Sequence, residues 1–348
     1  MTRTIISTGK AAPESTFDLR TQLGSLELQS PVLTASGCAA AGRELDNYFD
    51  ITAIGGIVTK SIMLAPRSGR ATPRMAETPS GMLNSIGLQG PGVESFLETD
   101  LAWLQRRGAR TIVSIAGGTA DEIGKVAAKL RVAGGFDAIE VNISCPNVED
   151  RGQVFACRAD TSAQIIQTVR RNSDNKIPIF AKLSPDVTDI VEIATSVSQA
   201  GATGVSVINT LLGMVIDTQT MRPVLAGVTG GLSGPAIRPI AVRCIWQIRS
   251  ALPNVPIIGM GGVRTGQDAL EMVLAGANAI SVGTSIFNDP GAPMRIQKEL
   301  EQELRNRGFE SLTQAISFAH REVSEAVIED ETGESKDESE PDWDFISE

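Results

Sequence analysis

Polar side chains directly follow several short apolar runs of the sequence, where they could take part in chemistry. Two lysines, two asparagines and one cysteine stand at such positions, together with hydroxyl groups and glycines. An ammonium group can balance an anionic ligand, and an amide can both donate and accept hydrogen bonds. This set of residue types indicates a ligand that is charged and rich in polar edges. In chain order the residues are Ser36, Lys60, Ser114, Asn142, Ser144, Cys145, Lys182, Asn209, Thr210, Gly261, Gly262, Gly283 and Thr284.

Cys145 is the residue of this set with the clearest potential for covalent or acid–base chemistry. It closely follows the apolar run 138–144 and precedes Pro146, and a thiol at such a place could act as a base or a nucleophile. A free cysteine is more often an inert, buried side chain, so the residue type alone does not decide between the two readings. Cys244, in contrast, falls on the apolar face of a predicted helix over 235–252, which indicates a core position.

Two glycine-containing segments predict a phosphate site. Residues 259–266 read GMGGVRTG and residues 282–285 read VGTS, and both stand at the ends of apolar runs. Glycines allow backbone N–H groups to approach phosphate oxygens closely. Tight turns alone would also need glycines, but two segments of this kind favour phosphate binding. Arg264 breaks the G-x-G-x-x-G pattern, so we do not expect a Rossmann-type dinucleotide site.

The cysteines and the single histidine disfavour a metal site. The intervals between Cys38, Cys145, Cys157 and Cys244 fit neither zinc nor iron–sulfur ligation. His320 is the only histidine, which also disfavours a His-dependent catalytic triad. The N-terminal residues lack the apolar run of a signal peptide, and no run approaches the roughly 18 apolar residues of a membrane span. We therefore expect a cytosolic protein whose cysteines are free thiols.

Eight apolar runs rich in β-branched residues predict the strands of the fold. Each run is nearly continuous, as expected for strands buried on both faces, and helical patterns separate most of them. This rhythm predicts an α/β fold, a (β/α)8 TIM barrel, with a doubly wound open sheet as the alternative. In such a barrel the active site lies at the C-terminal ends of the strands, where the polar residues stand. The runs are 30–36, 56–62, 111–116, 138–144, 177–183, 204–210, 255–261 and 279–285.

The barrel pattern occupies residues 23–321. The segments before and after it differ from the barrel in composition. Residues 1–22 form a polar extension, whereas residues 322–348 form a tail with twelve acidic residues and one lysine, a composition typical of disorder. The whole chain has a net charge of −10, so the remainder without this tail is nearly neutral and offers no basic face for nucleic acid. Residues 63–92 are too long for an ordinary connection, which predicts an inserted segment after the second strand.

Seven motifs of the sequence resemble those of class 1 dihydroorotate dehydrogenases of the B type, and they occur in the same order as in that family. The resemblance covers roughly residues 24–320 and implies a (β/α)8 barrel that holds FMN and oxidises dihydroorotate to orotate in de novo pyrimidine biosynthesis. It also implies a homodimer flanked by partner subunits with FAD and an iron–sulfur cluster, through which electrons reach NAD. The motifs are GMLNSIGLQ at 81–89, NISCPN at 142–147, KLSP at 182–185, INTLLGM at 208–214, GGLSGPAI at 230–237, GMGG at 259–262 and VGT at 282–284.

The same resemblance implies roles for individual residues. Cys145 would be the base that removes the C5 proton of dihydroorotate while hydride passes from C6 to the flavin N5. The implied substrate-binding residues are Lys60, Asn84, Ile86, Gly87, Leu88, Asn142, Asn147, Asn209 and Thr210. The implied cofactor-binding residues are Ala35, Ser36, Lys60, Ser114, Asn142, Lys182, Ile208, Gly234, Gly261, Gly262, Gly283 and Thr284.

Three positions depart from the family pattern, and two of them, Ser114 and Cys157, keep a non-catalytic reading open. Ser114 stands where the family usually has a flavin-contacting Asn, Gly90 stands where Asn is usual, and Cys157 replaces a Gly. An FMN oxidoreductase for another cyclic amide is one alternative, and a flavin-binding paralogue without catalysis is another. An aldolase or synthase barrel with a phosphate site would leave Lys182 and the amide cluster unexplained.

Overall fold

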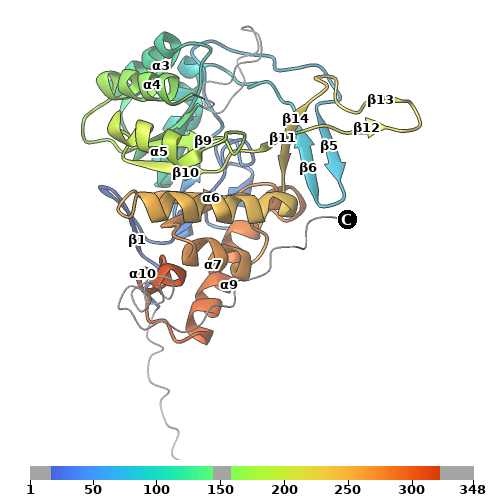
Figure 1. Ribbon diagram of the computed structural model, residues 1–348. Coiled ribbons are helices and arrows are strands. Elements are labelled where there is room, and N and C mark those ends of the chain that lie inside the picture. The colour runs from blue at the N-terminus through green and yellow to red at the C-terminus, as the bar shows by residue number, and fades with distance from the viewer. Residues whose placement is uncertain (1–16, 144–157, 322–348) are drawn as a thin grey trace, which may run out of the picture.

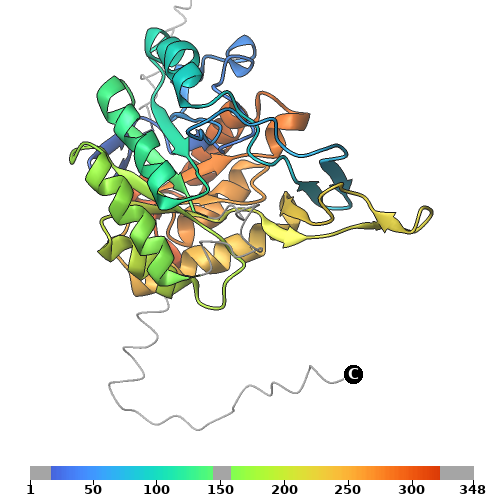
Figure 2. The ribbon, with the colours of Figure 1, turned by 90° about the horizontal axis from the view of Figure 1, so that it is seen from above.

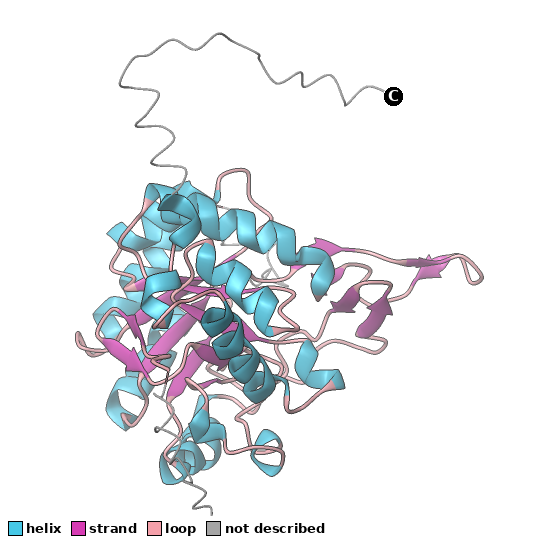
Figure 3. Cartoon of the chain, turned by 90° about the horizontal axis from the view of Figure 1, so that it is seen from below, coloured by secondary structure: helices cyan, strands magenta, loops and turns pink. Residues whose placement is uncertain are grey.

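Eight parallel strands form the centre of the protein, in a computed structural model that describes residues 17–143 and 158–321. Their order around the sheet is β3, β16, β15, β10, β9, β8, β7, β4, and helices surround them (Figure 3). The strands are β3 (Val32–Thr34), β4 (Ile57–Val58), β7 (Thr111–Ile115), β8 (Ala138–Asn142), β9 (Ile179–Leu183), β10 (Gly204–Val207), β15 (Ile257–Met260) and β16 (Ala279–Val282). All eight fall within the predicted apolar runs.

The two edges of this sheet meet, which makes it a barrel. A parallel bridge joins Leu33 of β3 to Gly56, and the Thr34 N–H donates to the Gly56 carbonyl at 3.2 Å. The close approach depends on Gly55, since a Cβ there would lie 2.2 Å from the Ser30 carbonyl oxygen. The predicted (β/α)8 barrel is thereby confirmed and the open-sheet alternative is wrong.

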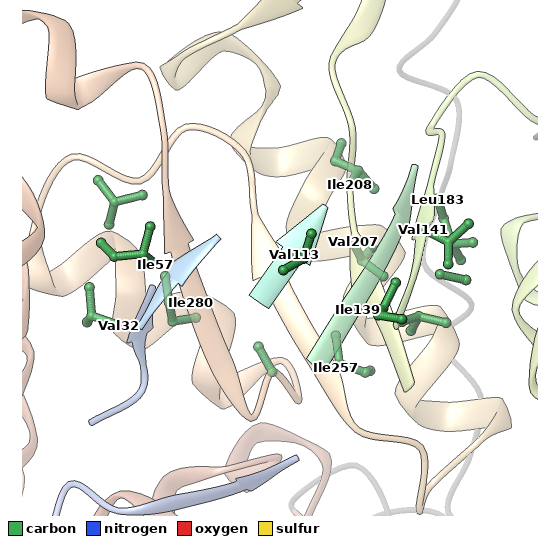
Figure 4. Close-up of a cluster of buried hydrophobic side chains, with 14 of the residues drawn as sticks. Val32, Ile57, Val113, Ile139, Val141, Leu183, Val207, Ile208, Ile257 and Ile280 are labelled. Carbon is green, nitrogen blue, oxygen red and sulfur yellow. The ribbon is translucent and has the colours of Figure 1, made fainter. Parts of the chain in front are cut away.

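Helices cover the outer face of the barrel (Figures 1 and 3). Outward side chains of the strands pack beneath them as the main core, part of which Figure 4 shows around Val113, Ile139 and Ile257. Cys244 of α6 is buried in this core, which confirms the predicted core position. The α-helices are α1 (Val93–Phe96), α2 (Ala102–Arg107), α3 (Ala120–Ala133), α4 (Ala159–Asn172), α5 (Ile190–Gln199), α6 (Arg238–Ala251), α7 (Gly266–Leu274), α8 (Ser285–Asn288), α9 (Ala292–Asn306) and α10 (Leu312–Ala315). Shorter turns are the 3-10 helices η1 (Leu45–Asn47), η2 (Ile51–Ala53) and η5 (Pro235–Ile237) and the π-helix η3 (Leu97–Leu101).

An N-terminal hairpin closes the bottom of the barrel. It consists of β1 (Thr21–Leu23) and β2 (Leu26–Leu28), which pair antiparallel. Three leucines of the hairpin join a second apolar cluster with inward residues of the strands, among them Ala138 and Phe180. The Thr21 hydroxyl donates to the carbonyl of Asn278, directly before β16, so the hairpin lies at the N-terminal ends of the strands.

A second, antiparallel sheet projects from the opposite end of the barrel (Figures 1 and 2). Its order is β11 (Leu211–Gly213), β14 (Gly230–Ser233), β6 (Gly81–Asn84) and β5 (Met75–Thr78). The small hairpin of β12 (Ile216–Asp217) and β13 (Arg222–Pro223) extends it outward, and we call residues 211–233 the arm. Pairing of β6 with β14 brings residues 81–84 and 231–233 together although they lie far apart in the sequence.

The predicted division into an extension (1–22), a barrel (23–321) and an acidic tail (322–348) stays a prediction, since residues 1–16 and 322–348 lie outside the described residues. Over 17–143 and 158–321, none of the helices has the length and apolar character that crossing a membrane requires.

Truncation of a leucine in the closing hairpin should destabilise the whole barrel. Leu28 is fully buried, so Leu28→Ala should lower the free energy of unfolding by about 2–5 kcal/mol through lost burial and a residual cavity. Val132→Ala is the matched control, because Val132 is 85% exposed on α3, and it should change the free energy by less than about 0.5 kcal/mol. Urea unfolding measures both. Equal, small effects would show that the hairpin is not part of the cooperative core.

Candidate active site

The described members of the predicted site lie at the C-terminal ends of the barrel strands and on the neighbouring sheet. Ala35 and Ser36 follow β3, Lys60 follows β4, Ser114 lies in β7, Asn142 ends β8, Lys182 lies in β9, Ile208, Asn209 and Thr210 follow β10, Gly261 and Gly262 follow β15, and Gly283 and Thr284 follow β16. Since parallel strands direct these ends to one side, the residues surround one barrel mouth. Cys145 and Asn147 belong to residues 144–157, which the structure does not describe, so their roles stay predictions.

A chain of hydroxyl groups crosses the barrel mouth. Ser61 Oγ lies 3.2 Å from Ser36 Oγ and 3.0 Å from Ser114 Oγ, and it also accepts a hydrogen bond from Asn142 Nδ2 at 3.3 Å. Four strand ends are therefore connected through one hydroxyl group. The sequence analysis missed Ser61, although its position beside Lys60 at the end of an apolar run was a usable signal.

Beneath this chain lies a buried pair of opposite charges. Glu140 Oε1 accepts a hydrogen bond from Ser114 Oγ at 3.2 Å and lies 3.8 Å from Lys182 Nζ. The exposed fractions of the Glu140 and Lys182 side chains are 1% and 7%. Strand register explains the proximity, because Ser114 pairs with Glu140 and Asn142 pairs with Lys182. The sequence analysis missed Glu140 too, yet an acidic residue inside an apolar run was a sign of a buried partner.

The amides form the next part of the mouth. Asn209 Nδ2 donates to Asn142 Oδ1 at 3.4 Å, and Asn209 Oδ1 accepts from the Thr210 N–H at 2.8 Å. The backbone of Asn209 is fixed by its N–H, which donates to the Leu183 carbonyl at 2.8 Å. Ile208 is buried, and its N–H donates to the Met260 carbonyl at 3.0 Å. These bonds orient polar groups of β8 and of the segment after β10 toward each other.

The sheet beside the barrel brings Asn84 to the same region. Asn84 Nδ2 donates to the carbonyl of Gly231 at 3.3 Å, and Gly231 lies directly against Thr210, since a Cβ on it would be 2.0 Å from Thr210 Oγ1. Ile86, Gly87 and Leu88 follow β6 on this side. Gly87 and Leu88 both have a positive φ, and a Cβ on Gly87 would be 2.8 Å from the Arg70 nitrogen, so this turn needs glycine there.

Glycines of three segments form a cradle on the other side of the mouth. Gly262 has φ +79°, and a Cβ on it would be 2.7 Å from the Gly234 carbonyl oxygen. Gly261 has φ +126°. Thr284 Oγ1 donates to Ser233 Oγ at 2.8 Å, which joins the segment after β16 to β14. Because a side chain at Gly262 would overlap with the Gly234 carbonyl, the segments after β15 and after β14 can pack this closely only with glycine at this position.

A cysteine of the segment after β3 lies beside Gly283, and a lysine lies beside the same segment. Lys60 Nζ lies 3.5 Å from the position of a Cβ on Gly37, and Cys38 Sγ lies 3.4 Å from that of a Cβ on Gly283. Burial raises the pKa of the Cys38 thiol, and the positive charges of Lys182 and Lys60 offset part of the rise. Cys38 is therefore a protonated thiol at neutral pH and offers little thiolate that could act as a base.

The arrangement can bind an anionic ligand and stabilise negative charge on it. Two ammonium groups, three amides and several hydroxyls surround one mouth, and the apolar interior below excludes water. Among the described residues, no group of three His, Cys, Asp or Glu side chains could hold a metal ion.

Comparison with known proteins gives one consistent result. The family model described as "Dihydroorotate dehydrogenase" matches residues 18–304. A relative from Geobacter sp. (strain M21), named "Dihydroorotate dehydrogenase B (NAD(+)), catalytic subunit", is 46% identical over 299 residues, which cover 86% of this chain and 97% of the relative. Relatives of the same name from Desulforamulus reducens and Geobacillus kaustophilus are 46% and 44% identical, covering 87% and 89% of this chain and 99% and 98% of theirs.

Alanine substitutions at Gly262 and at Gly308 should separate two causes of destabilisation, the overlap of a side chain with its neighbours and the strain of a positive φ. Gly262 and Gly308 have nearly the same φ, +79° and +78°, but nothing lies within 4 Å of a Cβ on Gly308. Gly308→Ala should therefore cost about 1–2 kcal/mol of unfolding free energy. Gly262→Ala should cost about 1–3 kcal/mol more because of the overlap, and it alone should lower the flavin content of the purified protein. Urea unfolding and the visible spectrum test both effects, and full flavin content in Gly262→Ala would contradict the cradle assignment.

Proposed function

The chain belongs to the dihydroorotate dehydrogenase family, and we propose that it is the catalytic subunit of a B-type enzyme that oxidises dihydroorotate to orotate in pyrimidine biosynthesis. The observation that carries this proposal is the connected polar set at the barrel mouth. Hydrogen bonds and close packing link Asn84, Thr210, Asn209 and Asn142 in one series that ends at Ser61. The proposed site of the reaction in the cell is the cytosol.

The proposed cofactor is FMN, and the chain's own residues fit it. The proposed phosphate-binding residues are Gly234, Gly261, Gly262, Gly283 and Thr284, whose segments pack so closely that a Cβ on Gly234 or Gly262 would overlap with neighbouring backbone. When bound, FMN would accept the hydride from C6 of dihydroorotate at N5. Lys182 would stabilise the negative charge of the reduced ring near its pyrimidine end. Ala35, Ser36, Lys60, Ser114, Asn142 and Ile208 would contact the ring and its side chain.

The substrate would bind through the amides and Lys60. Asn84, Asn142 and Asn209 can each donate to a carbonyl oxygen and accept from an N–H of the cyclic imide, which matches its alternating edges. The Lys60 ammonium can balance the substrate carboxylate, and Thr210 adds a hydroxyl. Ile86, Gly87 and Leu88 would contribute backbone groups. Asn147 is proposed as a further amide of this set.

Cys145 is the proposed base that removes the C5 proton. Ordinary thiols have a pKa of about 8.5, so only a few per cent are thiolate at neutral pH, and the rate should rise with pH toward the ionisation of this thiol. Cys38 is a poor candidate for the same role because burial raises the pKa of its thiol. The remaining described cysteine, Cys244, lies on the outer helix α6.

Electrons would leave the site through a partner subunit. The matched relatives are named catalytic subunits of an NAD(+) enzyme, and "subunit" indicates an assembly. We propose that the partner carries FAD and an iron–sulfur cluster, as the resemblance to B-type enzymes implies. The sequence of this chain has no dinucleotide motif of its own for NAD. Robust NAD reduction by the isolated chain would contradict this part of the proposal.

The arm is the proposed contact between two copies of the chain. In the described part of the chain, five of the ten large apolar residues that are exposed lie between 212 and 228, so apolar surface is concentrated there. They are Leu212, Met214, Ile216, Met221 and Val228. A monomer rarely exposes such a patch on a projecting hairpin, which supports a homodimer.

The test of the function is anaerobic addition of dihydroorotate to the purified, flavin-containing protein. Bleaching of the flavin absorbance and formation of orotate are expected. Flavin that stays oxidised would support an oxidoreductase for another cyclic amide or a non-catalytic paralogue, and absence of flavin would contradict the FMN assignment.

Replacement of the proposed base should slow this bleaching selectively. Cys145→Ser keeps a similar shape but is a much weaker base, so flavin reduction should slow by roughly 10²–10⁴-fold while FMN and orotate still bind. Cys244→Ser is the matched control, since the same atom change in the helix core should lower stability by roughly 1–3 kcal/mol and leave the rate unchanged. Anaerobic stopped-flow decides: an unaltered rate in Cys145→Ser would remove this residue from the mechanism.

Charge in the arm should disrupt the dimer. Ile216 and Met221 are 56% and 78% exposed, so Ile216→Glu with Met221→Glu should leave the fold intact but bury two charges in the interface. We expect a shift from dimer to monomer in sedimentation velocity at micromolar concentration. Val132→Glu, a similar change at an exposed position on α3, should leave the dimer unchanged. A double variant that sediments like the unaltered chain would exclude the arm as the contact.

A further inference from the structure

Glu140 is a buried carboxylate to which the proposed reaction gives no role. It lies in β8 between two apolar neighbours, and 1% of its side chain is exposed. Oε1 accepts from Ser114 Oγ, whereas Oε2 has no hydrogen-bond partner within residues 17–143 and 158–321. Burial of a carboxylate is costly unless an opposite charge compensates it.

The compensating charge is Lys182, the residue assigned to the reduced flavin. Its Nζ lies 3.8 Å from Glu140 Oε1, beyond the usual hydrogen-bond distance, so the two groups interact mainly through charge. Both side chains are largely shielded from water, and their fields therefore extend further than they would at the surface. A negative charge at this place must weaken the positive field that Lys182 exerts at the barrel mouth.

The residues that pair in register with Glu140 on β7 and with Lys182 on β10 are uncharged serines. Ser114 pairs in register with Glu140, and Ser206 of β10 pairs in register with Lys182. The hydroxyls of Ser206 and Ser281 are buried and, among the described residues, have no hydrogen-bond partner. The Glu140–Lys182 pair therefore contributes to the field at the mouth together with the Lys60 ammonium, which also acts on Cys38.

We propose that Glu140 is a positioning residue that holds the Lys182 ammonium at the barrel mouth and offsets part of its charge, so that it sets the reduction potential of the flavin. This inference rests on the proposed function, because it places Lys182 beside the flavin ring. It predicts a direction: loss of the carboxylate charge leaves more net positive field and stabilises the anionic reduced flavin. The potential of the flavin should then rise.

Glu140→Gln tests this with little change of shape. The amide oxygen can still accept from Ser114, while the charge is removed. Sulfite is the probe, since its addition to N5 of an oxidised flavin also creates an anionic ring. The dissociation constant of sulfite should fall on the order of tenfold, and the midpoint potential, measured against a reference dye, should become more positive. Glu140→Asp keeps the charge and should lie nearer to the unaltered protein on both measures.

Ser206→Ala is the matched control. It changes a buried side chain beside Lys182 without changing charge, so neither the sulfite dissociation constant nor the potential should move. Unchanged values in Glu140→Gln, or weaker sulfite binding with a lower potential, would overturn the proposal. If Glu140→Gln does not fold, the sulfite dissociation constant and the potential of Glu140→Asp decide instead. A larger change from the unaltered protein in Glu140→Asp than in Ser206→Ala would support the proposal. Changes of equal size in the two variants would overturn the proposal.

Failure of the proposed function can be recognised separately. Sulfite binding and the potential are measured on the FMN-loaded full chain without dihydroorotate. A protein that binds sulfite as predicted in all variants, but is not bleached by dihydroorotate, would contradict the assigned reaction and support the role of Glu140.

Discussion

Inside the barrel, the inward side chains change from apolar to polar between one inward residue of a strand and the next, two positions closer to its C-terminal end. Phe180 and Lys182 of β9 point to the same side of the strand, as do Ala138, Glu140 and Asn142 of β8. Ala138 and Phe180 belong to the apolar interior. Glu140, Asn142 and Lys182, which lie closer to the C-terminal ends of the strands, carry a charge or an amide. Because polar groups at this depth need partners, the strand register that aligns Ser114, Glu140 and Lys182 is the condition on which the site depends.

The second sheet supplies a site residue that the barrel strands cannot provide. A barrel alone would present only the ends of its own strands, and Asn84 is not part of one. Antiparallel pairing of β6 with β14 places Asn84 beside Gly231, which in turn contacts Thr210. The projecting sheet therefore forms one side of the site and is continuous with the exposed apolar residues of the arm. A substitution at the outer end of the arm is thus made in a structure continuous with the sheet that holds Asn84.

The sequence predicts the barrel well because each strand is a local signal. Gly204–Val207, for example, lies within a β-branched run that no helical period interrupts. Site residues such as Lys60 and Asn209 could be predicted for the same reason, since they end such runs. Ser61 and Glu140 each had a local signal in the sequence, but the hydrogen bonds that give them importance join residues 53 and 26 positions apart, which no local pattern encodes. The pairing of β6 with β14 is equally non-local, and no periodicity encodes it.

The closing hairpin ties the first residues of the barrel to some of the last. Gly24 approaches Thr203 so closely that a Cβ on it would be 2.3 Å from Thr203 Cγ2, Thr21 bonds to Asn278, and β3 pairs with β16. During synthesis on the ribosome, the leucines of this hairpin emerge long before the strands that bury them. The barrel can be sealed only when residue 282 has left the ribosome, so the growing chain exposes the apolar surface of this hairpin for most of its translation.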